Sequence, residues 1–108
     1  MTSQTTAPAG VAEWPLGERA TLVQFSTAFC APCRATRLLL GLVAEQMSGV
    51  GHVEVDAESH LELVRAYGIT STPTTLVLDP AGREAGRLAG VPDRHLVTAL
   101  VTARESAW

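Results

Sequence analysis

Two kinds of periodicity divide this chain into strands and helices. Short runs that are apolar throughout, or that alternate between apolar and polar positions, predict strands over residues 21–26, 52–56, 74–79 and 83–88. Apolar side chains that recur at intervals of three and four predict helices over residues 32–48 and 58–67 and a final helix capped by Asp93. The expected order is strand, helix, strand, helix, two strands and a final helix.

Each predicted helix carries an apolar stripe that we expect to face the core. The stripe positions are Leu38, Leu39, Leu42 and Val43 in the first helix, Leu61, Leu63 and Val64 in the second, and Leu96, Val97, Leu100 and Val101 in the last. Pro32 suits the first turn of its helix, where its missing N–H has no partner to lose.

This order of elements predicts an α/β domain with a mixed sheet flanked by helices. A strand–helix–strand unit forms a right-handed parallel crossover, so the first two strands are expected to pair in parallel. The turn at Asp79–Gly82 makes the last two strands an antiparallel hairpin. With 108 residues there is room for one domain, assigned to residues 11–108 and preceded by a flexible segment over residues 1–10.

Charge and hydropathy exclude several classes of partner. The formal net charge of −3 argues against nucleic acid or an anionic membrane as a main partner, because those partners need a basic face. No apolar run approaches the roughly 20 residues that span a bilayer. Residues 1–10 lack the basic and apolar regions of a secretory signal, so we expect a cytoplasmic protein. We separately expect it to act as a monomer.

The two cysteines, Cys30 and Cys33, lie where the first strand gives way to the first helix. A bridge between residues this close constrains the unfolded chain little, so the pair is not expected to serve stability. Partial positive charge and free N–H groups at a helix N-terminus lower the pKa of Cys30 from its usual ~8.5. We expect Cys30 to attack disulfides and Cys33 to resolve the mixed disulfide. Arg34 adds positive charge nearby, although an ordinary surface arginine explains it equally well.

A zinc site is the main alternative for two cysteines at this spacing. Tetrahedral zinc needs four ligands, and the sequence has no second such pair. His52, His60 and His95 fall on separate elements, so they are not expected to complete a site. No Gly-rich nucleotide fingerprint is present either. We therefore expect neither a metal nor a cofactor.

Several segments together match a known family. They are Leu22–Phe25 leading into Phe29–Arg34, then Val53–Asp56, Tyr67–Thr74 and Leu76–Leu78, followed by Gly82 and Gly90. On these residues the chain from Thr21 to Arg104 resembles the thioredoxin family. The resemblance implies the thioredoxin fold with a shortened N-terminal strand and helix, and a cis peptide bond before Pro73. It also implies a shallow apolar substrate groove lined by Phe29, Ala31, Pro32, Thr72, Pro73, Ala89 and Gly90.

Four positions depart from the family pattern. Phe29 replaces the usual tryptophan, and Ala31 replaces the usual glycine between the cysteines. The family's buried aspartate, thought to move protons for the inner cysteine, corresponds to Gln24, whose amide cannot act as an acid or base at neutral pH. The lysine that partners it corresponds to His52. His52, or a water held by Gln24, could take over the transfer of protons to and from Cys33. The favoured expectation for His52, however, is an exposed position on the strand.

The favoured function is a thiol–disulfide oxidoreductase that reduces protein disulfides through Cys30 and Cys33. An external donor of the thioredoxin-reductase type would return it to the dithiol. Two alternatives stay open. The same chemistry outside the cytoplasm would make the protein an oxidase or isomerase, which its reduction potential would reveal. The other alternative is a binding module whose redox chemistry is slow because Gln24 replaces the aspartate.

Overall fold

The computed structural model describes residues 14–106, so the flexible segment expected over residues 1–10 lies outside it. The elements follow the predicted order. They are β1 (Ala20–Ser26), α1 (Ala31–Gln46), β2 (Val50–Asp56), the 3-10 turn η3 (Ala57–Ser59), α2 (Leu61–Tyr67), β3 (Thr74–Leu78), β4 (Glu84–Ala89) and α3 (Arg94–Ser106). None of the helices in this part of the chain is long and apolar enough to cross a membrane.

The second predicted helix is divided in two. The carboxylate of Asp56 accepts hydrogen bonds from the Glu58 backbone N–H and the Ser59 hydroxyl, which closes η3. His60 then adopts φ −136° and ψ 58°, outside the helical region, before α2 begins. The prediction of one continuous helix over residues 58–67 is therefore wrong, because side-chain capping competes locally with helix propagation.

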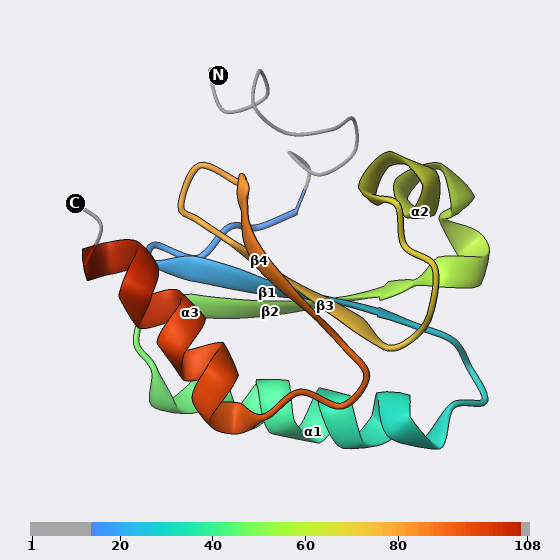
Figure 1. The fold of residues 1–108 in the computed structure, drawn as a ribbon, viewed down its shortest axis with the longest axis horizontal. Coiled ribbons are helices and arrows are strands. Elements are labelled where there is room, and N and C mark those ends of the chain that lie inside the picture. Colours follow the sequence, from blue (N-terminus) through green and yellow to red (C-terminus); the bar gives the residue numbers. More distant parts are fainter. Residues whose placement is uncertain (1–13, 107–108) are drawn as a thin grey trace.

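The sheet has the mixed topology expected from the order of elements, with strands arranged β2-β1-β3-β4. β1 pairs with β2 in parallel, whereas β3 is antiparallel to both β1 and β4. Figure 1 shows α1 and α3 on one side of the sheet and α2 on the other. This is the thioredoxin fold that the sequence predicts.

Each face of the sheet contributes to its own hydrophobic cluster. The cluster under α2 contains Val23, Phe25, Val55, Leu63, Tyr67, Ile69, Leu76 and Leu78, with Trp14 packed against it. The cluster under α1 and α3 contains Ala20, Leu22, Leu40, Val43, Val50, Val77, Val97 and Val101. Cover on both faces explains why β1 and β3 are buried at every position, including the polar residues Thr21, Gln24, Ser26, Thr74 and Thr75.

Four leucines assigned to buried stripes are exposed instead. They are Leu38, Leu42, Leu61 and Leu96. In α1 the buried face consists of Cys33, Thr36, Leu40 and Val43. The helix contains more apolar residues than one face can bury, so periodicity alone assigned the wrong phase.

Candidate active site

The predicted site segments meet at one end of strands β1, β3 and β4. Phe25, next to the end of β1, pairs with Thr74, the first residue of β3, and Thr74 pairs with Ala89, the last residue of β4. The loop that carries the cysteines leaves β1 at this end, and the loop through Pro73 enters β3 there. Gly90, in the left-handed conformation at φ 76°, donates its N–H to the Pro73 carbonyl at 2.9 Å. The register therefore brings the cysteine loop, the Pro73 loop and Gly90, which carry the expected groove residues, to the same end of the sheet.

Cys30 and Cys33 form a disulfide whose Cα atoms are 5.1 Å apart. Cys30 is the N-cap of α1, and its sulfur lies 3.2 Å from the backbone nitrogen of Cys33, which donates to it. Cys30 is partly exposed, whereas Cys33 is fully buried. The two sulfurs thus occupy different environments, one open to solvent beside helix N–H groups and one enclosed by the fold.

The residues expected to line a groove differ widely in exposure. Phe29 is 100% exposed, and Ala31, Pro32 and Ala89 are also exposed. Pro73 is buried and follows a cis peptide bond, as the family resemblance implied. Sequence reasoning missed Val91, an exposed apolar residue that follows Gly90 at the same end of the sheet. Its signal was its place directly after a predicted groove residue.

Gln24 lies buried behind the dithiol, with none of its surface exposed. Its amide nitrogen donates to the Cys33 carbonyl at 2.9 Å and to the Ser26 hydroxyl at 2.8 Å. A carbonyl oxygen can only accept, so these contacts fix which end of the amide is nitrogen. The amide holds the backbone of the inner cysteine and satisfies its own polar atoms in a buried position.

His52 completes this buried contact from the neighbouring strand. Its Nε2 lies 3.1 Å from Oε1 of Gln24. Because that oxygen only accepts, Nε2 carries the hydrogen. The favoured expectation of an exposed strand residue is wrong, since the ring is half-buried beneath α1. Burial lowers the pKa of His52, while the nearby Glu54 carboxylate opposes that shift.

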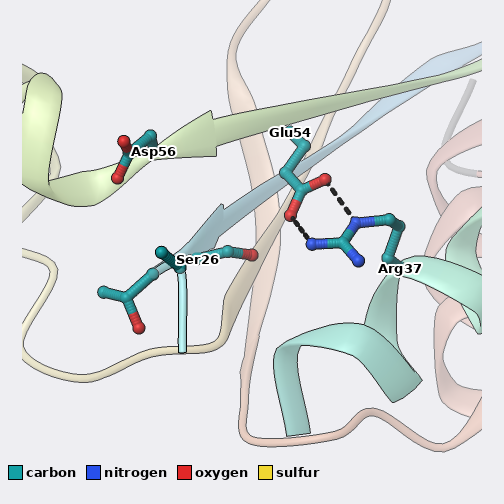
Figure 2. A pocket seen from close by; sticks show the side chains of 6 residues that line it. Ser26, Arg37, Glu54 and Asp56 are labelled. Carbon is teal, nitrogen blue, oxygen red and sulfur yellow. Dashed lines mark hydrogen bonds and ion pairs between the residues drawn. The ribbon is translucent and has the colours of Figure 1, made fainter. Parts of the chain in front are cut away.

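A pocket of about 320 Å³ opens beside the segment that leads to the cysteines. It is lined by Ser26, Thr27, Ala28, Arg37, Glu54 and Asp56. Figure 2 shows Arg37 reaching from α1 to Glu54 on β2, with two hydrogen bonds of 2.6 and 2.7 Å. The Arg37 guanidinium is the main reason that the pKa of Glu54 lies below its usual value. Sequence reasoning did not single out this pair, because its members are 17 residues apart.

The three histidines stand apart from one another in their contacts. His52 contacts Gln24, and the Nδ1 atom of His60 lies 3.1 Å from the Asp56 carbonyl. His95 is exposed near the start of α3. Within residues 14–106, no three histidine, cysteine or acidic side chains gather in a way that could hold a metal ion.

Comparison with known proteins gives consistent matches. The sequence model of the thioredoxin family matches residues 11–102. Thioredoxin from Mycoplasma pneumoniae is 30% identical over 81 residues, covering 75% of this chain and 78% of that protein. Thioredoxin from Mycoplasma genitalium is 28% identical over 76 residues, covering 70% and 74%.

Solved structures resemble the fold as well. A mutant thioredoxin from Halobacterium salinarum has a TM-score of 0.71 at 22% identity, over 80% of this chain and 74% of that one. The reduced Schistosoma mansoni thioredoxin has a TM-score of 0.69 at 23% identity, over 81% and 80%. At these identities the structural likeness concerns the fold, whereas the sequence matches concern the family.

Proposed function

Since the chain belongs to the thioredoxin family, whose members reduce protein disulfides through a CxxC pair, we propose a division of labour between its two cysteines. The chain is a thiol–disulfide oxidoreductase. In its reduced form, the Cys30 thiolate attacks one sulfur of a substrate disulfide. The substrate bond breaks, the other sulfur leaves as a thiolate that takes up a proton, and a mixed disulfide forms.

Cys33 then completes the transfer. Its thiol loses a proton and attacks the Cys30 sulfur, so the second substrate sulfur leaves as a thiol and the Cys30–Cys33 bond forms. Two electrons pass from the dithiol to the substrate. The observation that carries this assignment is the asymmetry of the pair: Cys30 is partly exposed and accepts the Cys33 N–H, whereas Cys33 is fully buried.

Trapping the mixed disulfide tests this assignment. Cys33→Ser removes the resolving thiol, so a substrate protein should stay covalently attached to Cys30 on a non-reducing gel. Cys30→Ser is the matched control and should trap nothing. If partner binding survives unchanged in both variants and no covalent complex forms, the chain acts as a binding module and the proposed redox role is rejected.

We also propose that the apolar residues at the end of the sheet beside the cysteines bind an extended segment of the substrate. Thr72 would offer backbone groups to a substrate strand, and Phe29 would pack against its side chains. The full exposure of Phe29 supports this, since an aromatic ring open to water contributes little to folding. Phe29→Ala should raise KM for a protein disulfide and leave the free energy of unfolding unchanged.

The proton for Cys33 needs a route that Gln24 cannot supply alone. We propose that His52, or a water held by Gln24, exchanges that proton with the Cys33 thiol. The 3.1 Å contact between His52 Nε2 and Gln24 Oε1 supports the role, because it holds a titratable ring next to the amide that donates to the Cys33 carbonyl. His52→Ala should lower reductase turnover and change its dependence on pH between pH 6 and 8. An unchanged profile would dismiss the role.

The remaining parts of the proposal concern partners and place of action. The substrates are proteins that contain disulfides, and electrons come from an external reductase of the thioredoxin-reductase type. We propose the cytoplasm as the compartment, because a dithiol of this kind works where thiols are kept reduced. Reduction of the oxidised chain by a purified thioredoxin reductase and NADPH, followed through NADPH consumption, tests the donor.

A further inference from the structure

The outward face of α1 carries apolar residues that the rest of the described chain does not cover. Leu38 is 72% exposed and Leu42 is 47% exposed, one turn apart. Gly41 lies between them, and the three residues line a hollow of about 410 Å³ together with Arg37 and Glu45. In Figure 1, α1 forms the lower border of the molecule. This face has the composition of a contact surface rather than of a solvated helix side.

Gly41 is hard to explain within one chain. A glycine in the middle of a helix is less favourable than alanine. A Cβ atom added at Gly41 would meet no heavy atom within 4 Å, so close packing inside the chain does not require a glycine there. Its effect is to leave a notch in the exposed surface beside Leu38. A notch of this kind lets another helix approach closely.

The charges around the notch are arranged symmetrically. Arg34, Leu38, Gly41 and Glu45 are spaced four, three and four residues apart, which places them within about 60° of one another around the helix axis. We call this row the α1 ridge. Its basic end is Arg34 and its acidic end is Glu45, both exposed. Arg37, beside the ridge, already has its charge paired with Glu54.

We propose that the α1 ridge docks against the same ridge of a second copy of this chain, in antiparallel orientation. A two-fold axis midway between Leu38 and Gly41 places Leu38 of each copy over the Gly41 notch of the other. The same rotation brings Arg34 opposite Glu45 twice. A parallel arrangement would instead set like charges beside each other, so the pattern favours the two-fold dimer.

The contact is small, because it involves one helix from each copy. Stable interfaces bury at least about 1,200 Å² in total, and two short ridges fall below that range. The dimer therefore exchanges with the monomer that the sequence leads us to expect, and it forms at high protein concentration. The α1 ridge contains none of Cys30, Cys33, Gln24 and His52, to which the proposed reductase chemistry is assigned.

Sedimentation equilibrium over a concentration series tests the dimer, with a reductant present so that no disulfide links two copies. The average mass should rise with concentration from the 11.4 kDa of one chain toward twice that value. Leu38→Glu should hold the mass at one chain throughout, with an unchanged circular dichroism spectrum because Leu38 is exposed. A mass that stays at one chain for the unaltered protein overturns the proposal.

A charge exchange tests the antiparallel arrangement. Arg34→Glu alone and Glu45→Arg alone each place like charges opposite each other and should weaken association by roughly tenfold. The double variant Arg34→Glu, Glu45→Arg restores the opposite charges and should restore association. If the double variant stays as weak as the single ones, the proposed arrangement is wrong.

Gly41→Ala separates the stability of one chain from the docking of two. The added methyl group meets open space in one chain and improves helix propensity, so the melting temperature should rise. In the dimer it fills the notch that receives Leu38, so association should weaken. An alanine variant that associates as well as the unaltered chain contradicts the close contact.

Discussion

The ring nitrogen Nε2 of His52 lies 3.1 Å from the amide oxygen of Gln24. The same amide donates from its nitrogen to the carbonyl of Cys33, so a titratable side chain on β2 is linked to the backbone of the inner cysteine through one residue of β1. A neutral amide suits this fully buried position, since a carboxylate without a cation would be costly there.

Acid should weaken the fold through His52. Burial lowers its pKa below the ordinary 6.5, so the unfolded chain takes up a proton before the folded chain does. The free energy of unfolding should therefore fall as the pH drops from 6.5 toward the lowered value. Urea titrations between pH 7.5 and 5.5 measure this fall, above the ordinary 4.5 at which Glu54 would begin to contribute. His52→Gln should flatten the slope, and an equal slope in that variant contradicts the assignment.

Gln24→Glu should lower the free energy of unfolding and speed the resolution of the mixed disulfide. A carboxylate oxygen would face the Cys33 carbonyl, where the amide now donates, so the variant should lose about 1–3 kcal/mol of unfolding free energy. Burial raises the pKa of a glutamate in this position, so the loss should be larger at pH 8 than at pH 5. Resolution of the mixed disulfide should become faster, because the new group titrates.

Gln24→Leu is the matched control for that variant. It has similar bulk and no titrating group, so it should lose stability without any gain in resolution rate. Stopped-flow measurement of substrate thiol release separates the two. Equal rates in Gln24→Glu and the unaltered protein would contradict a proton requirement at Cys33.

The two thiols of the reduced protein should react very unequally with iodoacetamide. Cys30 is partly exposed at the helix N-terminus, whereas Cys33 is fully buried. Alkylation of Cys30 should be at least about tenfold faster, and half of its maximal rate should be reached below pH 8.5. Peptide mass spectrometry of partly alkylated protein measures both rates. Comparable labelling of the two cysteines would remove the basis for their separate roles.

Neighbouring leucines of α1 should differ sharply in their contribution to stability. Leu40 is fully buried under the sheet, so Leu40→Ala should cost about 2–5 kcal/mol. Leu42 is 47% exposed, so Leu42→Ala should change the unfolding free energy by less than about 0.5 kcal/mol. Urea denaturation at low protein concentration gives both values. Similar losses would mean that α1 has a different rotation about its axis.

The order of the elements and the cysteine chemistry were predictable, because they depend on local patterns. Strand periodicity and the turn at residues 79–82 suffice for the parallel pair β1–β2 and the hairpin β3–β4, but not for the pairing of β1 with β3. The rotation of α1 was not predictable from its leucines alone, since five of the six residues from Leu38 to Val43 are apolar. Counting from Cys33, however, the spacing to Thr36, Leu40 and Val43 marks the buried face.

The family resemblance pairs the positions of Gln24 and His52, but the residue pattern of this chain alone does not show the contacts behind the dithiol. His52 and Gln24 are 28 residues apart, and their contact depends on the register in which β1 and β2 pair. Alternation along β2 shows that His52 lies on the face opposite Val53. It does not show that α1 covers that face too, which is why His52 is half-buried rather than exposed.

The reduction potential of the Cys30–Cys33 couple tests the central claim most directly. Equilibration with a series of dithiothreitol or glutathione buffers, followed by thiol labelling, gives the value. A disulfide reductase should have a potential near −270 mV, the value known for thioredoxin itself. A potential above about −180 mV would mean that electrons flow from substrate to protein, and it would contradict both the reductase function and the cytoplasmic compartment.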